Sequence, residues 1–444
     1  MSNGKKICIL GAGESGVGAA CLAMKVGHET FLSDNGTVAP EFKEIIRQKR
    51  IPFEEGKHSL DIILNADEII KSPGIPDDAQ IVREAIRRNI PIISEIEFAA
   101  RYTAGKKICI TGSNGKTTTA ELTFHILRQA GYDAALVGNI GNSFAARVAK
   151  NDADYYVLEL SSFQLDNMYD FKADIAILLN ITPDHLDRYE HDFEKYIQSK
   201  LRIMQNMDSR GAVLYCADDP VLKKYEISQR TPAAVYPFSV KNKMAAYKFD
   251  NEIVIDINEN KFTMNQSLLN IKGDHNMYNS MAAGIAAKLS GISNKQLQNS
   301  FSDFKGVEHR LEKYLKIRGV QFINDSKATN VNSVWYALQT VNTPTVLILG
   351  GVDKGNDYDV LKDLVKKKVK AIVAMGIDNS LIIKAFEDIV HVYDTHSMKK
   401  AVELSYTLAE DGETVLLSPA CASFDLFKNY QERGKIFKQV VRNL

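Results

Sequence analysis

The chain has 444 residues, of which 45% are hydrophobic and 25% charged, as in an ordinary globular protein of two or three domains. Its 55 basic and 55 acidic residues cancel, which argues against a nucleic acid or an anionic membrane surface as a partner. No apolar run approaches the roughly 18 residues of a membrane span, and the N-terminus enters a strand-like run without a signal-peptide pattern. The five cysteines have no paired spacing. We therefore expect a cytoplasmic protein that acts on small molecules.

Short apolar runs alternate with helical patterns along most of the chain, which predicts an α/β protein with parallel sheets. Residues 235–271 instead alternate apolar and polar side chains, which predicts a small β meander. The pattern restarts near residues 100 and 305, so we predict three domains at 1–100, 101–304 and 305–444. The strands are predicted at KICILG, ETFLSD, EIIKSPG, KICITG, YYVLEL, IAILLN, GAVLYC, TVLILGG, AIVAMG and TVLLSP.

The first glycine turn, GAGESG at residues 11–16, follows the first predicted strand and opens a helix. With Asp34 about 20 residues later it matches a dinucleotide-binding fingerprint, which favours a nicotinamide dehydrogenase as one interpretation. The other interpretation is that the turn holds the diphosphate of a nucleotide-linked substrate. KSPGIP, residues 71–76, ends another strand and would add backbone amides to the same site, or would be a plain proline turn.

The second glycine turn, residues 112–115 in TGSNGKTT, also lies between a predicted strand and a predicted helix. Such a turn can surround phosphate groups with backbone N–H groups at a helix N-terminus. Lys116 would reach the β and γ phosphates, and the hydroxyl of Thr117 would bind Mg²⁺. The strict pattern has glycine where this chain has Ile110, and a merely structural turn is the alternative.

Further polar stretches follow other predicted strands, where α/β sheets bind ligands. LELSSFQL carries Glu159, and LNITPDHLDRY carries His185; a carboxylate and an imidazole at neighbouring strand ends suit Mg²⁺ beside ATP. The remaining stretches of this kind are GDHNMYN, FKGVEHRLE, INDSKATN and SPACASFDLFKNYQERG.

Taken in order, these motifs resemble the Mur ligase family, ATP-dependent amide-forming enzymes of peptidoglycan precursor synthesis. The resemblance runs through all three predicted domains. The general motifs are shared with folylpolyglutamate synthetases, so that another amide ligase is the nearer alternative and a dehydrogenase the more distant one. INDSKATN and SPACASFD resemble the branch that adds D-glutamate to UDP-N-acetylmuramoyl-L-alanine, rather than those adding L-alanine, a diamino acid or a dipeptide.

The resemblance implies an N-terminal Rossmann-like domain for the UDP-linked substrate, a central P-loop domain for ATP and a C-terminal Rossmann-like domain for the amino acid. It implies ATP as a substrate, two Mg²⁺ sites, and a monomer without nucleic-acid or membrane partners. The implied catalytic residues are Lys116, Glu159, His185 and a carbamylated Lys200, and the implied metal ligands are Thr117, Glu159, His185 and Lys200.

The binding residues that the resemblance implies fall into three groups. For ATP they are Gly112, Ser113, Asn114, Gly115, Lys116, Thr117, Thr118, Asn276, Asn279, Arg310 and Asp325. For the UDP-linked substrate they are Gly13, Glu14, Ser15, Gly16, Asp34, Asn35, Ser72, Pro73, Gly74, Asn139 and Ser161. For D-glutamate they are Thr329, Lys354, Ser423, Phe424 and Tyr430.

Lys200 also stands out by its spacing. Phe193, Ile197, Lys200 and Met204 recur on one face of a predicted helix. A lysine on such a face either extends its ammonium to water or is held neutral by desolvation. A neutral amine can take up CO₂ as a carbamate, an anionic oxygen ligand for Mg²⁺. The resemblance favours the carbamate.

Overall fold

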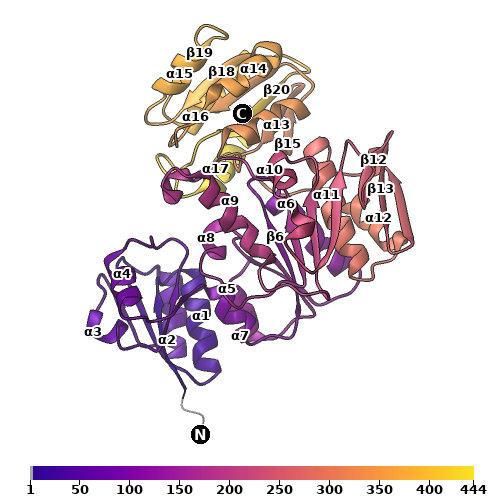
Figure 1. The fold of residues 1–444 in the computed structure, drawn as a ribbon. Coiled ribbons are helices and arrows are strands. Elements are labelled where there is room, and N and C mark those ends of the chain that lie inside the picture. The colour runs from indigo at the N-terminus through magenta and orange to yellow at the C-terminus, as the bar shows by residue number, and fades with distance from the viewer. Residues whose placement is uncertain (1–3) are drawn as a thin grey trace. The chain divides into compact units, whose positions relative to one another are not determined.

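A computed structural model describes residues 4–444, which form three α/β regions, each built on its own sheet (Figure 1). The chain divides into two compact units. One comprises the residues up to Leu269 together with Met277–Phe304, and the other comprises Asn270–Asn276 together with Lys305–Leu444. The predicted α/β class with three domains is confirmed, whereas the predicted boundaries stay a prediction. No helix within residues 4–444 is long and apolar enough to cross a membrane.

The first sheet has the strand order β3-β2-β1-β4-β5, and every pairing in it is parallel. Its inner strand β1 is buried from Ile7 to Leu10, because helices cover both faces of a doubly wound sheet. The strands are β1 Lys6–Leu10, β2 Glu29–Asp34, β3 Phe53–Glu55, β4 Glu68–Lys71 and β5 Ile92–Ile93. The helices are α1 Glu14–Lys25, α2 Pro40–Lys49, α3 Leu60–Ile63, α4 Gln80–Arg87 and α5 Glu95–Ala100.

The central sheet has the order β14-β13-β12-β11-β10-β9-β6-β8-β7. Its strands are β6 Lys106–Thr111, β7 Ala134–Gly138, β8 Tyr155–Glu159, β9 Ile175–Leu178, β10 Ala212–Cys216, β11 Ala234–Ser239, β12 Ala246–Phe249, β13 Glu252–Ile257 and β14 Asn260–Asn265. The predicted meander is only partly correct. β12, β13 and β14 do pair antiparallel, but β11 and β12 continue the parallel sheet beside β10. Alternation predicts a strand, not its partner.

The helices around the central sheet connect its strands, and the last of them ends at residue 303. They are α6 Lys116–Gln129, α7 Phe144–Lys150, α8 Ser162–Leu165, α9 Phe193–Leu201, α10 Pro220–Lys224, α11 Asp274–Leu289 and α12 Asn294–Asp303. Short 3₁₀ helices lie at η1 Leu186–Tyr189, η2 Arg202–Met204, η3 Ile227–Gln229 and η4 Gln266–Leu268. α6 packs on α12, β7 and β8. Because α6 follows β6 directly, its N-terminus lies at the carboxyl edge of the sheet.

The third sheet has the order β15-β16-β20-β17-β18-β19, and only β15 runs antiparallel to its neighbour. The strands are β15 Glu312–Ile317, β16 Val320–Asn324, β17 Thr345–Leu349, β18 Val369–Met375, β19 Val392–Thr395 and β20 Thr414–Leu417. The helices are α13 Val331–Thr340, η5 Tyr358–Leu361, α14 Lys362–Lys368, α15 Ser380–Phe386, α16 Met398–Leu408 and α17 Tyr430–Arg442. Apolar clusters lie on both faces of this sheet.

Candidate active site

The second glycine turn connects β6 to α6. Gly112 has φ +154°, and Gly115 has φ +87° where it begins the helix. A Cβ atom on Gly112 would lie 3.0 Å from Cβ of Leu179, and one on Gly115 would lie 2.5 Å from Oδ1 of Asn279. Glycine is therefore required at both positions. The N–H groups of the first turn of α6, which a helix cannot bond internally, lie here and can bind an anion.

The loop after β9 holds this turn in place. The side-chain amide of Asn180 donates to the carbonyl of Asn114 (2.9 Å) and accepts from its N–H (2.8 Å). The hydroxyl of Ser113 donates to the carbonyl of Thr182 (2.8 Å) and lies 3.2 Å from the hydroxyl of Tyr196. The N–H of Ser113 is also used inside the protein, because it donates to the carbonyl of Asn180 at 2.8 Å. Ser113 therefore holds the turn in place, and its contact with ATP stays a prediction.

Two lysines converge on the carbonyl oxygen of Gly112. Nζ of Lys116 donates to it at 2.7 Å, and Nζ of Lys200 donates to it at 3.0 Å. Lys200 is 2% exposed and lies 4.6 Å from the ring centroid of Tyr196. Burial, and after it the charge of Lys116, lowers the pKa of Lys200 well below the usual value of a lysine. The predicted inward orientation of Lys200 is correct, and the ammonium does not extend to water.

Glu159, at the end of β8, joins three elements of the site. Its side chain is buried, and Oε2 accepts from the hydroxyl of Thr117 at 2.7 Å. Oε1 accepts from Nδ2 of Asn139 at 2.8 Å, and the Glu159 carbonyl accepts from the N–H of Asn139 at 2.8 Å. A carboxylate and a hydroxyl beside a phosphate-binding turn form an oxygen-rich set of the kind that Mg²⁺ prefers.

The other predicted residues of this edge lie on the loops around it. Contrary to our prediction, Glu159 and His185 do not follow neighbouring strands, because β6 lies between β8 and β9. His185 adopts φ +53°, with Nε2 3.6 Å from Oδ2 of Asp184 and its ring edge-on to Phe163. Ser161 caps α8 with a reciprocal bond to Gln164, so its side chain has a structural role. The hydroxyl of Thr118 is buried and has no hydrogen-bond partner among residues 4–444.

Asn279 extends from α11 to the second glycine turn, where its Oδ1 accepts from the hydroxyl of Thr119 at 3.2 Å. Asn276, which belongs to the other unit, donates from Nδ2 to the carbonyl of Lys272 at 2.8 Å. The pair predicted from GDHNMYN is thus divided between the two units.

The first glycine turn has the tight geometry of a diphosphate-binding loop. A Cβ atom on Gly16 would lie 1.8 Å from the carbonyl oxygen of Gly11, whereas one on Gly13 would meet nothing within 4 Å. Asp34 turns its carboxylate to the backbone, accepting from the N–H of Ala12 (2.6 Å) and of Gly36 (2.7 Å). A dinucleotide site instead uses such a carboxylate for the ribose hydroxyls.

The remaining predicted residues of this site lie on the loops beside that turn. Asn35 follows Asp34 and is exposed, and a Cβ atom on Gly74 would meet nothing within 4 Å. The N–H of Ser72 donates to the carbonyl of Leu10 at 3.0 Å. Ser15 and Pro73 line a small recess together with Phe163 and other residues.

Glu14 has a partner that the sequence did not reveal. Its Oε1 accepts from the N–H of Ser143, which precedes α7, at 3.1 Å. The hydroxyl of Ser143 donates to Glu95 at 2.7 Å. Ser143 therefore bonds both to the short helix α5, through Glu95, and to the first glycine turn, through Glu14. An apolar run with two acidic residues, SEIEFAA, was the only signal for this contact in the sequence.

In the second unit, Asp325 follows β16 and is buried. It accepts from the hydroxyl of Ser418 (2.8 Å) and the N–H of Leu311 (3.1 Å). Burial raises its pKa to about 6, against the lowering effect of the Arg310 charge. Nε of Arg310 is buried and has no hydrogen-bond partner among residues 4–444. An unsatisfied buried donor of this kind fits an anionic ligand.

The five predicted D-glutamate contacts lie on loops after β16, β17 and β20 and at the start of α17. Lys354 and Phe424 are exposed, and Ser423 is buried. Thr329 and Tyr430 are half-buried, and Nζ of Lys327 lies 5.2 Å from the centroid of the Tyr430 ring.

Arg433, which we did not include among the site residues, connects these loops. Its guanidinium is fully buried and donates to the carbonyls of Ser326, Gly350 and Cys421. A buried cation that satisfies three loop carbonyls fixes the geometry of the loops around it.

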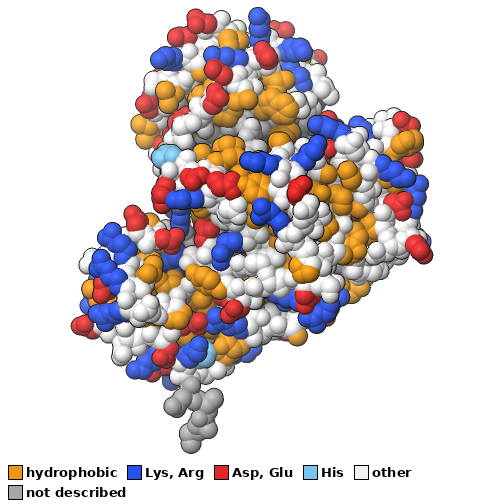
Figure 2. All heavy atoms as spheres, viewed as in Figure 1, with side chains coloured by type: hydrophobic (Ala, Val, Ile, Leu, Met, Phe, Trp, Pro, Cys, Tyr) orange, Lys and Arg blue, Asp and Glu red, His pale blue; other side chains and the backbone are white. Residues whose placement is uncertain are grey.

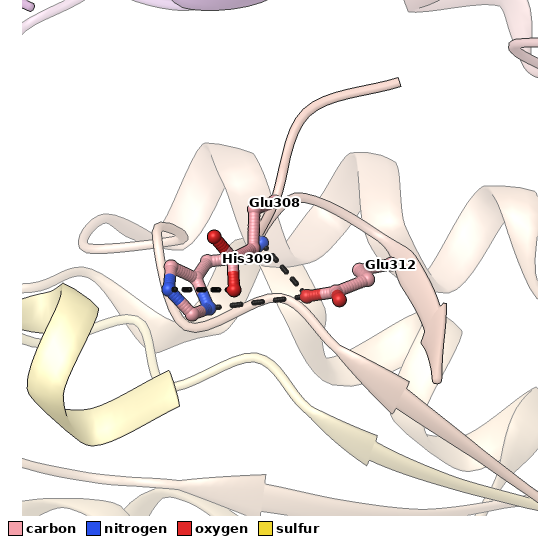
Figure 3. Close-up of side chains that lie close together, drawn as sticks. All are labelled: Glu308, His309 and Glu312. Atoms are coloured by element: carbon pink, nitrogen blue, oxygen red, sulfur yellow. Dashed lines mark hydrogen bonds and ion pairs between the residues drawn. The ribbon is translucent and has the colours of Figure 1, made fainter. Parts of the chain in front are cut away.

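A cluster of Glu308, His309 and Glu312 lies beside Arg310 (Figure 3). Their ligand atoms lie within 4.8 Å of one another, but Nζ of Lys438 pairs with both carboxylates, at 2.9 Å to Glu312. His309 is buried, and Asn324 contacts its Nδ1 at 2.8 Å. With a cation already between the carboxylates, this cluster is an ion-pair network. On the face shown in Figure 2, basic and acidic side chains are interspersed.

Comparisons with known protein families cover nearly the whole chain. Residues 5–94 match the Mur ligase MurD-like N-terminal domain, residues 110–287 the Mur ligase middle domain, and residues 309–421 the glutamate ligase domain of Mur ligases. The UDP-N-acetylmuramoylalanine–D-glutamate ligase of Bacteroides fragilis is 53% identical over 444 residues, covering 99% of this chain and 100% of that one. The enzyme of the same name from Porphyromonas gingivalis is 52% identical, covering 99% and 98%.

Solved structures agree on the fold. The UDP-N-acetylmuramate–alanine ligase of Thermotoga maritima matches with a TM-score of 0.64 at 17% identity, covering 99% of both chains. The MurF ligase of Thermotoga maritima in complex with ADP matches with a TM-score of 0.62 at 15% identity, covering 93% of this chain and 95% of that one. With three family domains and 53% identity along its whole length, this chain belongs to the Mur ligase family.

Proposed function

We propose that this protein is an ATP-dependent ligase that joins D-glutamate to UDP-N-acetylmuramoyl-L-alanine in peptidoglycan precursor synthesis. Relatives that are named for this activity match along their full length. The observation that supports the proposal best is Glu159, which bonds at once to Thr117 of the phosphate-binding helix and to Asn139. The nicotinamide dehydrogenase interpretation is set aside, because the chain belongs to another family and Asp34 bonds to backbone N–H groups.

The reaction must activate a carboxylate, because hydroxide is a poor leaving group. A carboxylate oxygen of the substrate attacks the γ-phosphorus of ATP, and ADP leaves. The amine of D-glutamate then attacks the carbonyl carbon of the acyl phosphate, loses a proton, and phosphate departs. Charge accumulates on the transferred phosphoryl group, so positioning and cations provide most of the rate enhancement.

The P-loop residues supply the grip on ATP. The backbone of residues 112–115 and the N-terminus of α6 surround the phosphates, and Lys116 moves from the carbonyl of Gly112 to the β and γ phosphates. Thr118, Asn279, Asn276, Arg310 and Asp325 contact other parts of the nucleotide. Nε of Arg310, buried without an acceptor among the described residues, supports its role.

The residues at the end of β8 fit a Mg²⁺ ion. Thr117 and Glu159 supply a hydroxyl and a carboxylate that already lie 2.7 Å apart, and His185 lies on the loop after β9, on the other side of β6. Mg²⁺ neutralises charge on the phosphoryl oxygens when it is bound. A second ion would be held by His185 and by Lys200 as a carbamate, which the buried position and the lowered pKa of Lys200 support.

The substrate contacts divide between two other groups of loops. The first glycine turn, with Gly13, Ser15, Gly16, Ser72, Pro73 and Gly74, holds the UDP moiety, and Asn139 contacts the substrate near its reacting end. Thr329, Lys354, Ser423, Phe424 and Tyr430 hold D-glutamate. All reactants are small molecules of the cytoplasm, where we propose that the enzyme acts. The predicted monomer stays a prediction.

One assay tests the proposed function. Phosphate release from ATP is measured with UDP-N-acetylmuramoyl-L-alanine and, in turn, D-glutamate, L-glutamate, L-alanine or meso-diaminopimelate. We expect release with D-glutamate alone, and none when the UDP-linked substrate is left out. Release with meso-diaminopimelate or L-alanine but not with D-glutamate would overturn the proposal.

A further inference from the structure

Helix α5 carries two buried carboxylates that bond to different loops of the same unit. Glu97, 1% exposed, accepts from the backbone N–H groups of residues 169–171 at 2.9 to 3.2 Å. Glu95, 3% exposed, accepts from the hydroxyl of Ser143 at 2.7 Å and from the N–H of Ala145 with the same oxygen. Buried carboxylates this well satisfied fix the segments that they bond.

Ser143 is bonded from two sides. Its hydroxyl donates to Glu95 of α5, while its N–H donates to Glu14 of the first glycine turn. α1 also packs directly on it, since a Cβ atom on Gly18 would lie 2.1 Å from the Ser143 hydroxyl. The position of Ser143 is therefore set by α1 and α5 together.

Ser143 ends the turn of residues 138–143, which carries Asn139. This turn is closely packed: a Cβ atom on Gly138 would lie 2.4 Å from the carbonyl oxygen of Glu159, and one on Gly141 2.3 Å from that of Leu136. Backbone hydrogen bonds close the turn, from the N–H of Gly138 to the carbonyl of Asn142 (3.3 Å) and from the N–H of Asn142 to the carbonyl of Leu136 (3.4 Å), so that it moves as a unit. A displacement of Ser143 must then displace Asn139, which makes two hydrogen bonds to Glu159.

We propose that Glu95 is a positioning residue of the ligation reaction, which holds Ser143 and, through the turn of residues 138–143, holds Asn139 against Glu159. Glu14 supports Ser143 from the loop that would bind the diphosphate. The network thereby links that loop to the carboxylate beside the phosphate-binding turn. This inference rests on the proposed ligase function and adds residues to it that do not touch a reactant.

The chain offers a matched control for the test. Glu95→Leu and Glu97→Leu each remove a buried acceptor of backbone N–H groups from the same helix, two residues apart. Glu95→Gln keeps an acceptor oxygen and is the conservative rescue, and Ser143→Ala removes only the hydroxyl. For each full-length variant we would measure the Tm, kcat, the KM for D-glutamate, and hydrogen exchange of residues 138–143 without nucleotide or metal.

We expect both leucine variants to lower the Tm, but only Glu95→Leu to lower kcat, by tenfold or more. Its KM for D-glutamate should stay within twofold, because the residues proposed to bind that substrate lie in the other unit. Hydrogen exchange of residues 138–143 should be faster in Glu95→Leu and unchanged in Glu97→Leu. Glu95→Gln should recover most of kcat, and Ser143→Ala should lose about threefold or more.

The inference is wrong if Glu95→Leu keeps kcat within twofold of the parent, or if Glu97→Leu loses as much kcat as Glu95→Leu. Should Glu95→Leu fail to fold, parent-like kcat and exchange in Ser143→Ala would overturn it equally. A parent protein without D-glutamate-dependent phosphate release would instead overturn the proposed function. The two failures are therefore distinguishable.

Discussion

Lys116 and Lys200 donate to the same carbonyl oxygen, that of Gly112. The charge of Lys116 so close by disfavours the charged form of Lys200. Lys200 is enclosed by protein, with the Tyr196 ring on one side, so its ammonium is poorly solvated. The neutral amine that desolvation favours is the form that reacts with CO₂. The burial of Lys200 thus argues against snorkelling, and the carbamate stays a prediction.

We predict that Lys200→Arg, which keeps the cation but cannot form a carbamate, loses kcat by about 100-fold or more, on the scale of losing one stabilising group. Lys200→Ala should be equally inactive and should regain part of its activity with excess acetate or formate. Steady-state phosphate release measures both. Parent-like activity of Lys200→Arg would contradict the carbamate.

Lys116→Ala should lower kcat by about 1,000-fold, because the missing charge would act on the transferred phosphoryl group. Its free energy of unfolding should change by less than about 1 kcal/mol, since the side chain is only half-buried and donates to carbonyls of the glycine turn. The matched control is Lys106→Ala at the opposite end of β6, which should keep its activity. Near-normal phosphate release by Lys116→Ala would show that the turn is merely structural.

Glu95 gives a pH-dependent prediction. Burial, and less strongly the charge of Glu14, raises its pKa from 4.5 to about 7. A carboxyl that binds its proton more tightly when folded stabilises the fold at low pH, and this contribution is lost as pH rises from about 4.5 to about 7. The loss is on the order of 3 kcal/mol.

Urea unfolding at several pH values between 4.5 and 8 tests this. Glu95→Gln, which cannot ionise, should show a flatter decline of unfolding free energy than the parent. Other acids with raised pKa values, such as Asp325 and Asp219, lower the unfolding free energy in the same direction in both proteins. The difference between the two curves therefore reports Glu95. Parallel curves for parent and variant would contradict the raised pKa.

Residues that hold the site together were harder to predict from the sequence than residues that meet a ligand. Glu159 ends a predicted strand and Lys116 follows a glycine turn. Both are reactive residue types at positions where α/β sheets bind ligands, so the sequence identifies them. Glu95 and Arg433 stand in helical patterns, and only the folded structure shows that they are buried and which loops they bond. Burial of a charge depends on tertiary partners, which no local pattern contains.

At the scale of elements, α1 and α7 approach closely because α1 has glycine at residue 18. A Cβ atom there would lie 2.1 Å from the hydroxyl of Ser143 and 3.0 Å from the backbone nitrogen of Ala146. Alanine would improve helix propensity by about 1 kcal/mol, but overpacking against backbone costs about 1–3 kcal/mol.

Gly18→Ala should therefore destabilise the protein by up to about 2 kcal/mol, despite the better helix propensity of alanine. In the Ser143→Ala background the same substitution should cost less, because the hydroxyl is gone. A double-mutant cycle of unfolding free energies measures the difference. If Gly18→Ala were stabilising, α1 and α7 would have to be farther apart than the structure places them.

The sequence predicted where strands lie better than it predicted which strands pair with one another. Buried runs such as those of β1, β6 and β17 identify themselves by composition, whereas alternation in residues 235–271 could not show that β11 and β12 extend a parallel sheet. Strand partners are decided by long-range packing. For the same reason the sequence did not show that α5 bonds both to the turn of residues 138–143 and to the loop of residues 169–171.

At the scale of the whole molecule, two glycine turns on two sheets fit one reaction with two phosphate-bearing reactants. The second turn has the features of an ATP site, with a lysine, a hydroxyl and a buried carboxylate in contact. The first has a comparably tight turn but lacks an acidic side chain turned outward for a ribose, because Asp34 bonds to the backbone.

The last prediction follows from that difference. UDP should bind the full-length protein, whereas NAD(H) and NADP(H) should not, because the carboxylate that a dinucleotide site turns to the ribose hydroxyls is held here by the N–H groups of Ala12 and Gly36. Calorimetric titration with each ligand, in the presence of saturating ADP to occupy the second turn, measures binding at the first turn alone. Gly13→Leu should abolish the UDP signal, since residue 13 has open space where a diphosphate would lie. Nicotinamide binding without UDP binding would reverse the assignment of the first turn.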